Sequence, residues 1–133
     1  MADLTPRLLY VDANRGRADA VLQQIKEICK GCPVTTAENG NEAMKLLGRE
    51  KFDLILMDCW IPEISGFKIC RLIRQTDEKV PVILISDLDL MNDRKFAEGA
   101  GATAYFMKDR DVKELLDFVS ELINSNSKSS AMH

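Results

Sequence analysis

The chain has very little histidine and no long apolar run. Its only histidine among 133 residues is His133, at the last position. A zinc site built on Cys29 and Cys32 would need two further ligands, and one terminal histidine does not supply them. No apolar stretch approaches the roughly 20 residues that a membrane-spanning helix needs. Residues 1–6 also lack the charged-then-apolar pattern of a secretion signal. We therefore expect a cytoplasmic protein with no membrane partner.

The chain has no excess of positive charge and few cysteines. Its formal net charge of -3 gives no reason to expect nucleic-acid binding. Cys29 and Cys32 have the spacing of a redox or metal pair, but they close a predicted helix instead of opening one. The helix dipole therefore does not activate a thiol there, and we expect no functional role for the pair. Cys59 and Cys70 are expected to pack as small hydrophobes.

Apolar runs alternate with helical patterns along nearly the whole chain. This alternation predicts one domain with a parallel sheet covered by helices on both faces. Strands are expected at residues 8–11, 34–37, 52–58, 80–86 and 104–107. Helices are expected at about 17–30 and at 66–75, 90–98 and 112–123. One more helix is expected to begin after an N-cap at Asn41. Strands buried on both faces should bury Leu8, Val11, Ile55, Met57, Val82 and Leu84. Residues 1–124 should form the domain, and the polar residues 125–133 a disordered tail or a linker.

Asp58 is the most informative residue. It ends the apolar run of residues 54–57, and Pro62 and Gly66 then force a loop. A carboxylate at the carboxyl end of a buried parallel strand faces the crevice in which open α/β sheets bind ligands. Because burying a carboxylate is costly unless it is paired or binds a cation, Asp58 is predicted to be a site residue.

Three other predicted strands also end in polar residues. Asp12 follows the strand at residues 8–11, Ser86 ends the strand at 80–86, and Lys108 follows the strand at 104–107. Two carboxylates, a hydroxyl and an amine at one sheet edge suit an anion held together with a divalent cation. The residues themselves therefore indicate a magnesium and phosphoryl site.

With these residues in this order, the chain resembles a response-regulator receiver domain over roughly residues 7–124. This family is the chemotaxis-regulator-like phosphoacceptor module of two-component signalling, with a flavodoxin-like doubly wound (βα)5 fold. The landmarks that carry the resemblance are residues 56–58 with Pro62 and Gly66, then Ser86, Tyr105, Lys108 and the turn at Asn39-Gly40. The resemblance implies a phosphoacceptor signalling domain and not an enzyme.

The resemblance also implies a role for each site residue. Asp58 would accept a phosphoryl group from a histidine kinase or phosphotransfer protein, and Lys108 and Ser86 would bind its oxygens. Mg²⁺ would bind weakly to Asp12, Asp58 and the backbone carbonyl of Trp60. The side chains of Trp60 and Leu88 would control water access, and Tyr105 would change rotamer as the switch. The partner, a downstream protein or an output domain, would bind the fourth helix, fifth strand and fifth helix.

Three positions depart from the family pattern. Ala13 stands where the family has a second acid that binds the metal, so Mg²⁺ should bind weakly. Asp87 replaces a small residue after the strand-four hydroxyl, and its charge would repel phosphate. It could be a substitute metal ligand, but we favour a polar side chain that points to solvent. Asp109 replaces a proline that follows a cis bond, and a cis bond here would cost about 3–4 kcal/mol.

These departures keep a second class open. The alternative is a phosphorylation-independent pseudo-receiver, a protein-binding module that keeps the surface and has lost the chemistry. A dehalogenase-like phosphatase is less suitable, because it would need an acid two residues after its nucleophile, where Trp60 stands.

Overall fold

The computed structural model describes residues 5–13, 15–87 and 92–131, and within them strands alternate with helices from end to end. The strands are β1 Leu8–Val11, β2 Val34–Ala37, β3 Leu54–Asp58, β4 Val82–Ser86 and β5 Ala104–Met107. The helices are α1 Arg15–Ile28, α2 Gly40–Arg49, α3 Gly66–Thr76, α4 Asp93–Ala100 and α5 Val112–Ala131.

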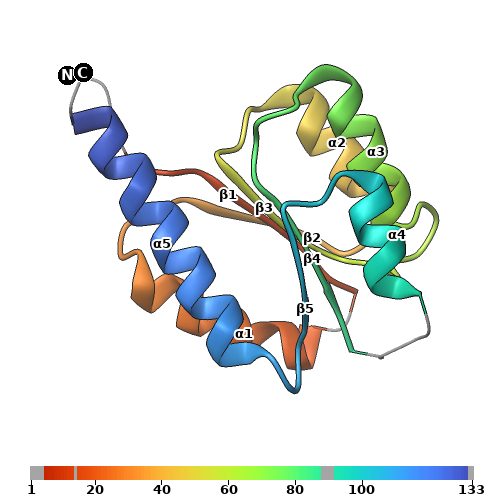
Figure 1. Cartoon of the computed structure of the whole chain (residues 1–133), viewed down its shortest axis with the longest axis horizontal. Helices are drawn as coiled ribbons and strands as arrows, with labels where there is room; N and C mark the ends of the chain where they lie inside the picture. Colours follow the sequence, from red (N-terminus) through yellow and green to blue (C-terminus); the bar gives the residue numbers. More distant parts are fainter. Residues whose placement is uncertain (1–4, 14, 88–91, 132–133) are drawn as a thin grey trace.

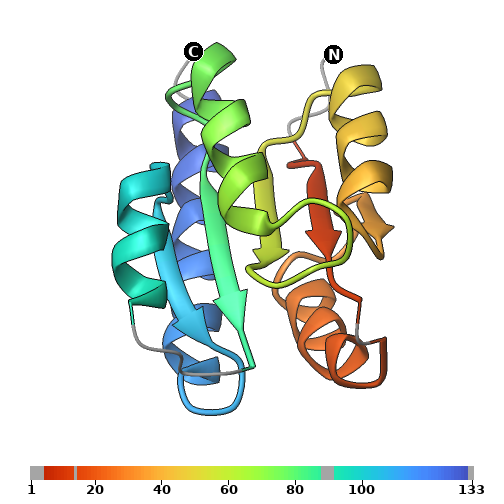
Figure 2. The same ribbon diagram turned by 90° about the vertical axis from the view of Figure 1, so that its right-hand side faces the viewer.

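All five strands run parallel in one sheet with the order β2-β1-β3-β4-β5. Helices α1 and α5 cover one face, and α2, α3 and α4 cover the other (Figures 1 and 2). The chain reverses its direction of travel across the sheet between β1 and β3, and the carboxyl ends of the strands at such a switch point are where open α/β sheets bind ligands. The predicted α/β fold is confirmed.

Alternation along each strand divides the core into two halves. Leu9, Val11 and Met57 pack against α2, α3 and α4, whereas Leu8 and Tyr10 pack against α1 and α5. This is the two-residue period of a strand that is covered on both faces. Each of the six residues predicted to be buried, Leu8, Val11, Ile55, Met57, Val82 and Leu84, is at most 2% exposed.

Several helix ends differ from the predictions: α1 spans Arg15–Ile28 instead of about 17–30, and α4 spans Asp93–Ala100 instead of 90–98. The start of α2 and the end of α5 differ as well. The N-cap of α2 is Asn39, whose side chain accepts a hydrogen bond from the backbone N of Glu42 at 2.8 Å. The prediction of Asn41 was wrong, because Asn41 already lies inside the helix and its side chain donates to Glu63 at 2.6 Å.

Helix α5 continues past its predicted end at Ile123 to Ala131, into the segment expected to be disordered. Extending an existing helix fixes one residue for each hydrogen bond gained, and no glycine or proline interrupts residues 124–131. The role of this segment as tail or linker stays a prediction.

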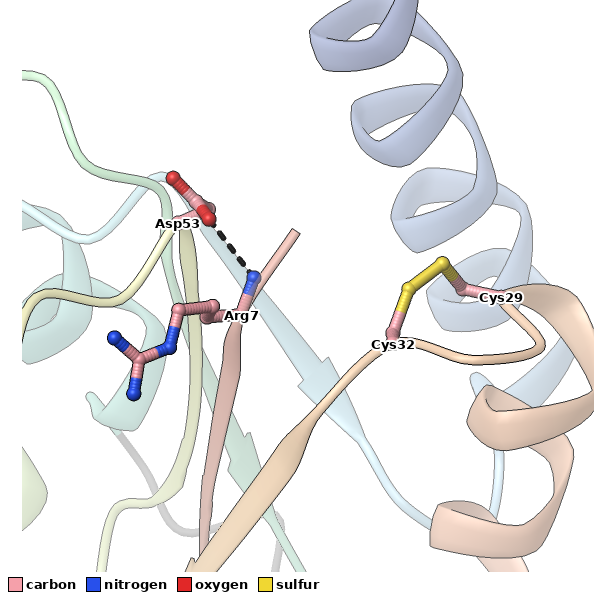
Figure 3. Close-up of a disulfide and its surroundings, with 4 residues drawn as sticks. All are labelled: Arg7, Cys29, Cys32 and Asp53. Carbon is pink, nitrogen blue, oxygen red and sulfur yellow. Dashed lines mark hydrogen bonds between the residues drawn. A yellow bond between two sulfur atoms is a disulfide. The ribbon is translucent and has the colours of Figure 1, made fainter. Parts of the chain in front are cut away.

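Two strands begin later than expected, at Leu54 and Val82. Before β4, Pro81 has no N–H to donate, and the backbone N of Val80 donates to the side chain of Asp77 at 3.0 Å. The residues before β3 and before β1 form a hydrogen bond: the backbone N of Arg7 donates to the Asp53 carboxylate at 2.8 Å (Figure 3).

Cys29 and Cys32 form a disulfide directly after α1 (Figure 3). Gly31, with a φ of 86°, turns the chain and brings the two Cα atoms to 5.6 Å, a distance that suits a disulfide. Sequence spacing alone had not predicted this pairing, because it does not show how the chain turns after a helix. Both cysteines are partly buried against the core between the sheet, α1 and α5.

Reducing this disulfide should lower the free energy of unfolding by no more than about 2 kcal/mol, because the closed loop is short. Urea unfolding with and without a thiol reductant measures the difference. A Cys29→Ser/Cys32→Ser variant serves as the control and should respond to urea identically in both conditions. A loss of about 4 kcal/mol on reduction would contradict this account, since only a long loop supports such a value.

Candidate functional site

The carboxyl ends of four neighbouring strands bring Asp12, Asp58, Ser86 and Lys108 together. Asp12 follows β1, Asp58 and Ser86 end β3 and β4, and Lys108 follows β5. All four are buried, with exposed fractions of 3%, 7%, 0% and 3% respectively. The sequence prediction that these residues share one sheet edge is therefore confirmed in the geometry.

Lys108 is the centre of this group. Its ammonium Nζ donates to the carboxylate of Asp12 and to Oδ2 of Asp58, the latter at 3.0 Å. Its backbone N donates to the carbonyl oxygen of Ser86 at 2.9 Å, which anchors the residue to the end of β4. The side chain thus joins residues that lie 96 and 50 positions away in the sequence.

The protonation of this pair follows from burial and from the neighbouring charges. Burial raises the pKa of Asp58, although the Trp60 N–H and the Lys108 charge act in the opposite direction. Burial by itself would lower the pKa of Lys108, but hydrogen bonds and charges from Asp12 and Asp58 outweigh it and the pKa is raised. Lys108 is therefore an ammonium at neutral pH.

The loop after β3 folds back closely on Asp58. The backbone N of Trp60 donates to Asp58 Oδ1 at 3.0 Å, and the backbone N of Gly66 donates to the carbonyl of Cys59 at 2.9 Å. A Cβ atom on Gly66 would lie 2.3 Å from the carbonyl oxygen of Asp58. Only glycine fits at this approach, so Gly66 helps to position the carboxylate.

Asp87 faces the site, and the expectation that it points to solvent was wrong. Its Oδ2 lies 3.6 Å from Lys108 Nζ, and its side chain is 22% exposed. The physical reason is its position directly after β4, beside the strand end that carries Lys108. That position directly after an apolar run was the signal in the sequence that placed Asp87 near the site.

The carboxylates of Asp12, Asp58 and Asp87 make the surroundings of the site strongly negative. Tyr10 on β1 is affected by these charges. Burial raises the pKa of its phenol, and the charges of the three carboxylates raise it further. The positive charge of Lys108 is therefore shared among three carboxylates.

The donor set fits magnesium only in part. Asp12 and Asp58 offer the carboxylate oxygens that Mg²⁺ prefers, but Ala13 offers none. In residues 5–13, 15–87 and 92–131, no group of three or more histidine, cysteine or acidic residues is arranged to hold a metal ion. The backbone carbonyl of Trp60 stays a predicted third ligand. Asp12 and Asp58 would thus be the two carboxylates at the site that could hold such an ion.

Two of the remaining predicted residues, Tyr105 and Trp60, contact residues of α4. Tyr105 is 7% exposed, and the guanidinium of Arg94 lies over its ring at 5.1 Å. Trp60 is 47% exposed, packs edge-on against Phe67 and donates its indole N–H to Asp93 at 3.2 Å. Sequence reasoning did not find the contact with Asp93, which comes from a distant helix. Leu88 lies outside the described residues.

The peptide bond between Lys108 and Asp109 is trans, as are the other bonds in the described part of the chain. A non-proline residue makes the cis form costly, so the departure from the family pattern at Asp109 has the expected consequence.

Among the described residues, no helix is both long enough and apolar enough to cross a membrane.

Comparison with known proteins gives a consistent result. The family model for the response regulator receiver domain matches residues 8–120. Response regulator MprA of Mycobacterium leprae is 27% identical over 117 residues, which cover 88% of this chain and 50% of that protein. The chain thus spans about half the length of this curated relative.

Two solved structures are similar over almost their whole length. The receiver domain of the Francisella response regulator 1452 has a TM-score of 0.78 at 26% identity, covering 91% of this chain and 98% of that one. The receiver domain of the sensor histidine kinase PA1611 from Pseudomonas aeruginosa PAO1, which has a magnesium ion coordinated in its active-site cleft, has a TM-score of 0.77 at 27% identity. That match covers 90% of this chain and 98% of the other.

Proposed function

This chain belongs to the family of response regulator receiver domains, and from this we propose that Asp58 accepts a phosphoryl group from a histidine kinase or a phosphotransfer protein. The observation that carries the proposal is the contact of Lys108 Nζ with both Asp12 and Asp58 at the carboxyl edge of the sheet. This ammonium lies where the charge of a phosphoryl group on Asp58 would have to be neutralised.

In the proposed reaction, an oxygen of Asp58 forms a bond to phosphorus while the bond from phosphorus to the donor's imidazole nitrogen breaks. The product is an acyl phosphate on β3 and a free imidazole on the donor. Phosphoryl transfer depends mainly on positioning and charge neutralisation, which Lys108 and the buried Ser86 hydroxyl would supply by contacting the phosphoryl oxygens. Bound Mg²⁺, held by Asp12 and Asp58, would add positive charge.

Treatment of the wild-type protein with acetyl phosphate and Mg²⁺ tests the proposal. Mass spectrometry should locate one added phosphoryl group on Asp58, and Asp58→Asn should remove the modification. If the wild type stays unmodified at Asp58 even in high Mg²⁺, the domain is a pseudo-receiver. The replacement of an acid by Ala13 and the contact of Asp87 with Lys108 are the observations that favour this second candidate.

Restoring an acid with Ala13→Asp should tighten Mg²⁺ binding by roughly tenfold, because it adds a carboxylate ligand beside Asp12. Modification of Asp58 should then be faster, since a cation that is held better neutralises more of the phosphoryl charge. Trp60 is the only tryptophan, and its fluorescence measures the titration with Mg²⁺. The exposed Asp117→Ala is the control and should change neither result. Equal Mg²⁺ affinity in the wild type and the Ala13→Asp variant would contradict this account of Ala13.

We further propose that α4, β5 and α5 form the surface that binds a downstream protein or an output domain. Tyr105 lies on β5 and contacts Arg94 of α4, so a change of its rotamer would alter both elements. Phe96 of α4 is 51% exposed and supplies apolar contact area. This domain and its partner would bind each other in the cytoplasm. An NMR shift map with a partner should centre on these elements, and a map centred on α1 would rule this surface out.

A further inference from the structure

We propose that the Asp87 carboxylate competes with the phosphoryl group for Lys108, and thereby limits how readily Asp58 is modified. This inference rests on the proposed phosphorylation of Asp58 and concerns the regulation of that same site. It assigns a role to a residue at which this chain departs from the family pattern.

The geometry places Asp87 beside the phosphoryl-binding group. Asp87 directly follows Ser86, and the hydrogen bond from the Lys108 backbone N to the Ser86 carbonyl holds the two strand ends together. Its Oδ2 lies 3.6 Å from Lys108 Nζ, within the range of an ion pair but longer than a direct hydrogen bond. A phosphoryl group that contacts both Ser86 and Lys108 would have to share this space with Asp87.

Asp87 differs from the other two acids around Lys108. The side chains of Asp12 and Asp58 are 1% and 10% exposed and contact Nζ directly, whereas that of Asp87 is 22% exposed and makes the longest of the three contacts. It is therefore the acid whose hold on the ammonium is easiest to displace. An incoming phosphoryl group would contact Lys108 by displacing the carboxylate of Asp87. The two negative groups would still repel each other.

The charges at this end of the sheet make the competition significant. Lys108 already contacts three carboxylates, so a phosphoryl group would add a further negative charge beside an ammonium that these acids share. Removing the charge of Asp87 reduces the repulsion and frees part of the field of Lys108. Asparagine keeps the size of the side chain without its charge, so it separates charge from bulk.

The test compares the wild type with Asp87→Asn, Asp87→Ala and the control Asp117→Ala, which removes an exposed acid on α5. The rate of Asp58 modification by acetyl phosphate at fixed Mg²⁺ should rise roughly tenfold in both Asp87 variants, about the effect of one partly screened charge contact. The control should match the wild type. A gain in Asp87→Ala alone would show that bulk and not charge is decisive, and would overturn the proposal.

A second readout does not depend on covalent modification. Beryllofluoride in Mg²⁺, followed by Trp60 fluorescence, should bind roughly tenfold more tightly to both Asp87 variants than to the wild type and the control. Weaker binding of Mg²⁺ and slower modification in the variants would overturn the inference, because Asp87 would then be a metal ligand. If the variants bind beryllofluoride more tightly but no protein is modified on Asp58, the competition stands and the proposed function fails.

Discussion

Replacing Lys108 with methionine is expected to lower the free energy of unfolding by about 3–5 kcal/mol near neutral pH, the usual cost of removing one partner from a buried ion pair. Methionine is close to lysine in length, so the variant leaves little empty space. It does leave the carboxylates of Asp12 and Asp58 buried without the ammonium that they both contact. Urea unfolding at pH 7 measures the loss.

The loss should depend on pH, with a sign set by Asp58. Burial raises its pKa in the folded protein, and Lys108 partly opposes that shift, so the pKa should rise further in the variant. A carboxyl whose folded pKa lies above its unfolded value favours the folded state at low pH, and this contribution is lost as the pH rises through the folded pKa. The stability of the variant relative to the wild type should therefore be lowest at pH values above the pKa that Asp58 has in the folded variant.

Unfolding curves of the wild type and Lys108→Met at several pH values check this, with Lys113→Met, an exposed lysine on α5, as the matched control. The control should stay close to the wild type at every pH. A Lys108→Met deficit that is below about 1 kcal/mol would place this pair with exposed ion pairs, and would contradict the assigned burial. A deficit that does not change with pH would contradict the account of Asp58.

Replacing Gly66 with alanine is expected to damage both stability and phosphorylation. The added Cβ would lie 2.3 Å from the Asp58 carbonyl oxygen and 3.1 Å from the Cα of Cys59, and neither backbone atom can move aside freely. We expect a loss of about 1–3 kcal/mol in the free energy of unfolding, typical of overpacking. A small displacement of Asp58 should also slow its modification by on the order of a hundredfold.

Gly48→Ala is the matched control for this prediction. Gly48 lies in α2, and a Cβ there meets nothing within 4 Å. That variant should gain up to about 1 kcal/mol, because alanine favours a helix over glycine, and its modification should match the wild type. Equal behaviour of the two variants would show that the close approach of Gly66 to Asp58 is unimportant in solution.

The sequence by itself determined the carboxyl ends of the strands and the polar residues that stand there. Strands buried on both faces need continuous apolar runs, so the points at which those runs stop at Asp12, Asp58, Ser86 and Lys108 could be read locally. Parallel strands have their carboxyl ends at one edge, which was enough to predict that these residues meet. The bounds of β5 were also predicted correctly, at Ala104 and Met107.

Only the tertiary structure decided how these residues contact one another. Lys108 lies 50 and 96 positions from the acids that it joins, so the register of β5 on β4 and the order of β1 beside β3 set its contacts. The same register turned Asp87 toward Lys108, against our expectation of solvent. The close approach of Gly66 to Asp58 likewise depends on how the loop after β3 folds back. Local patterns specify which residues end a strand, whereas distances between side chains of different strands arise from pairing and packing across the sheet.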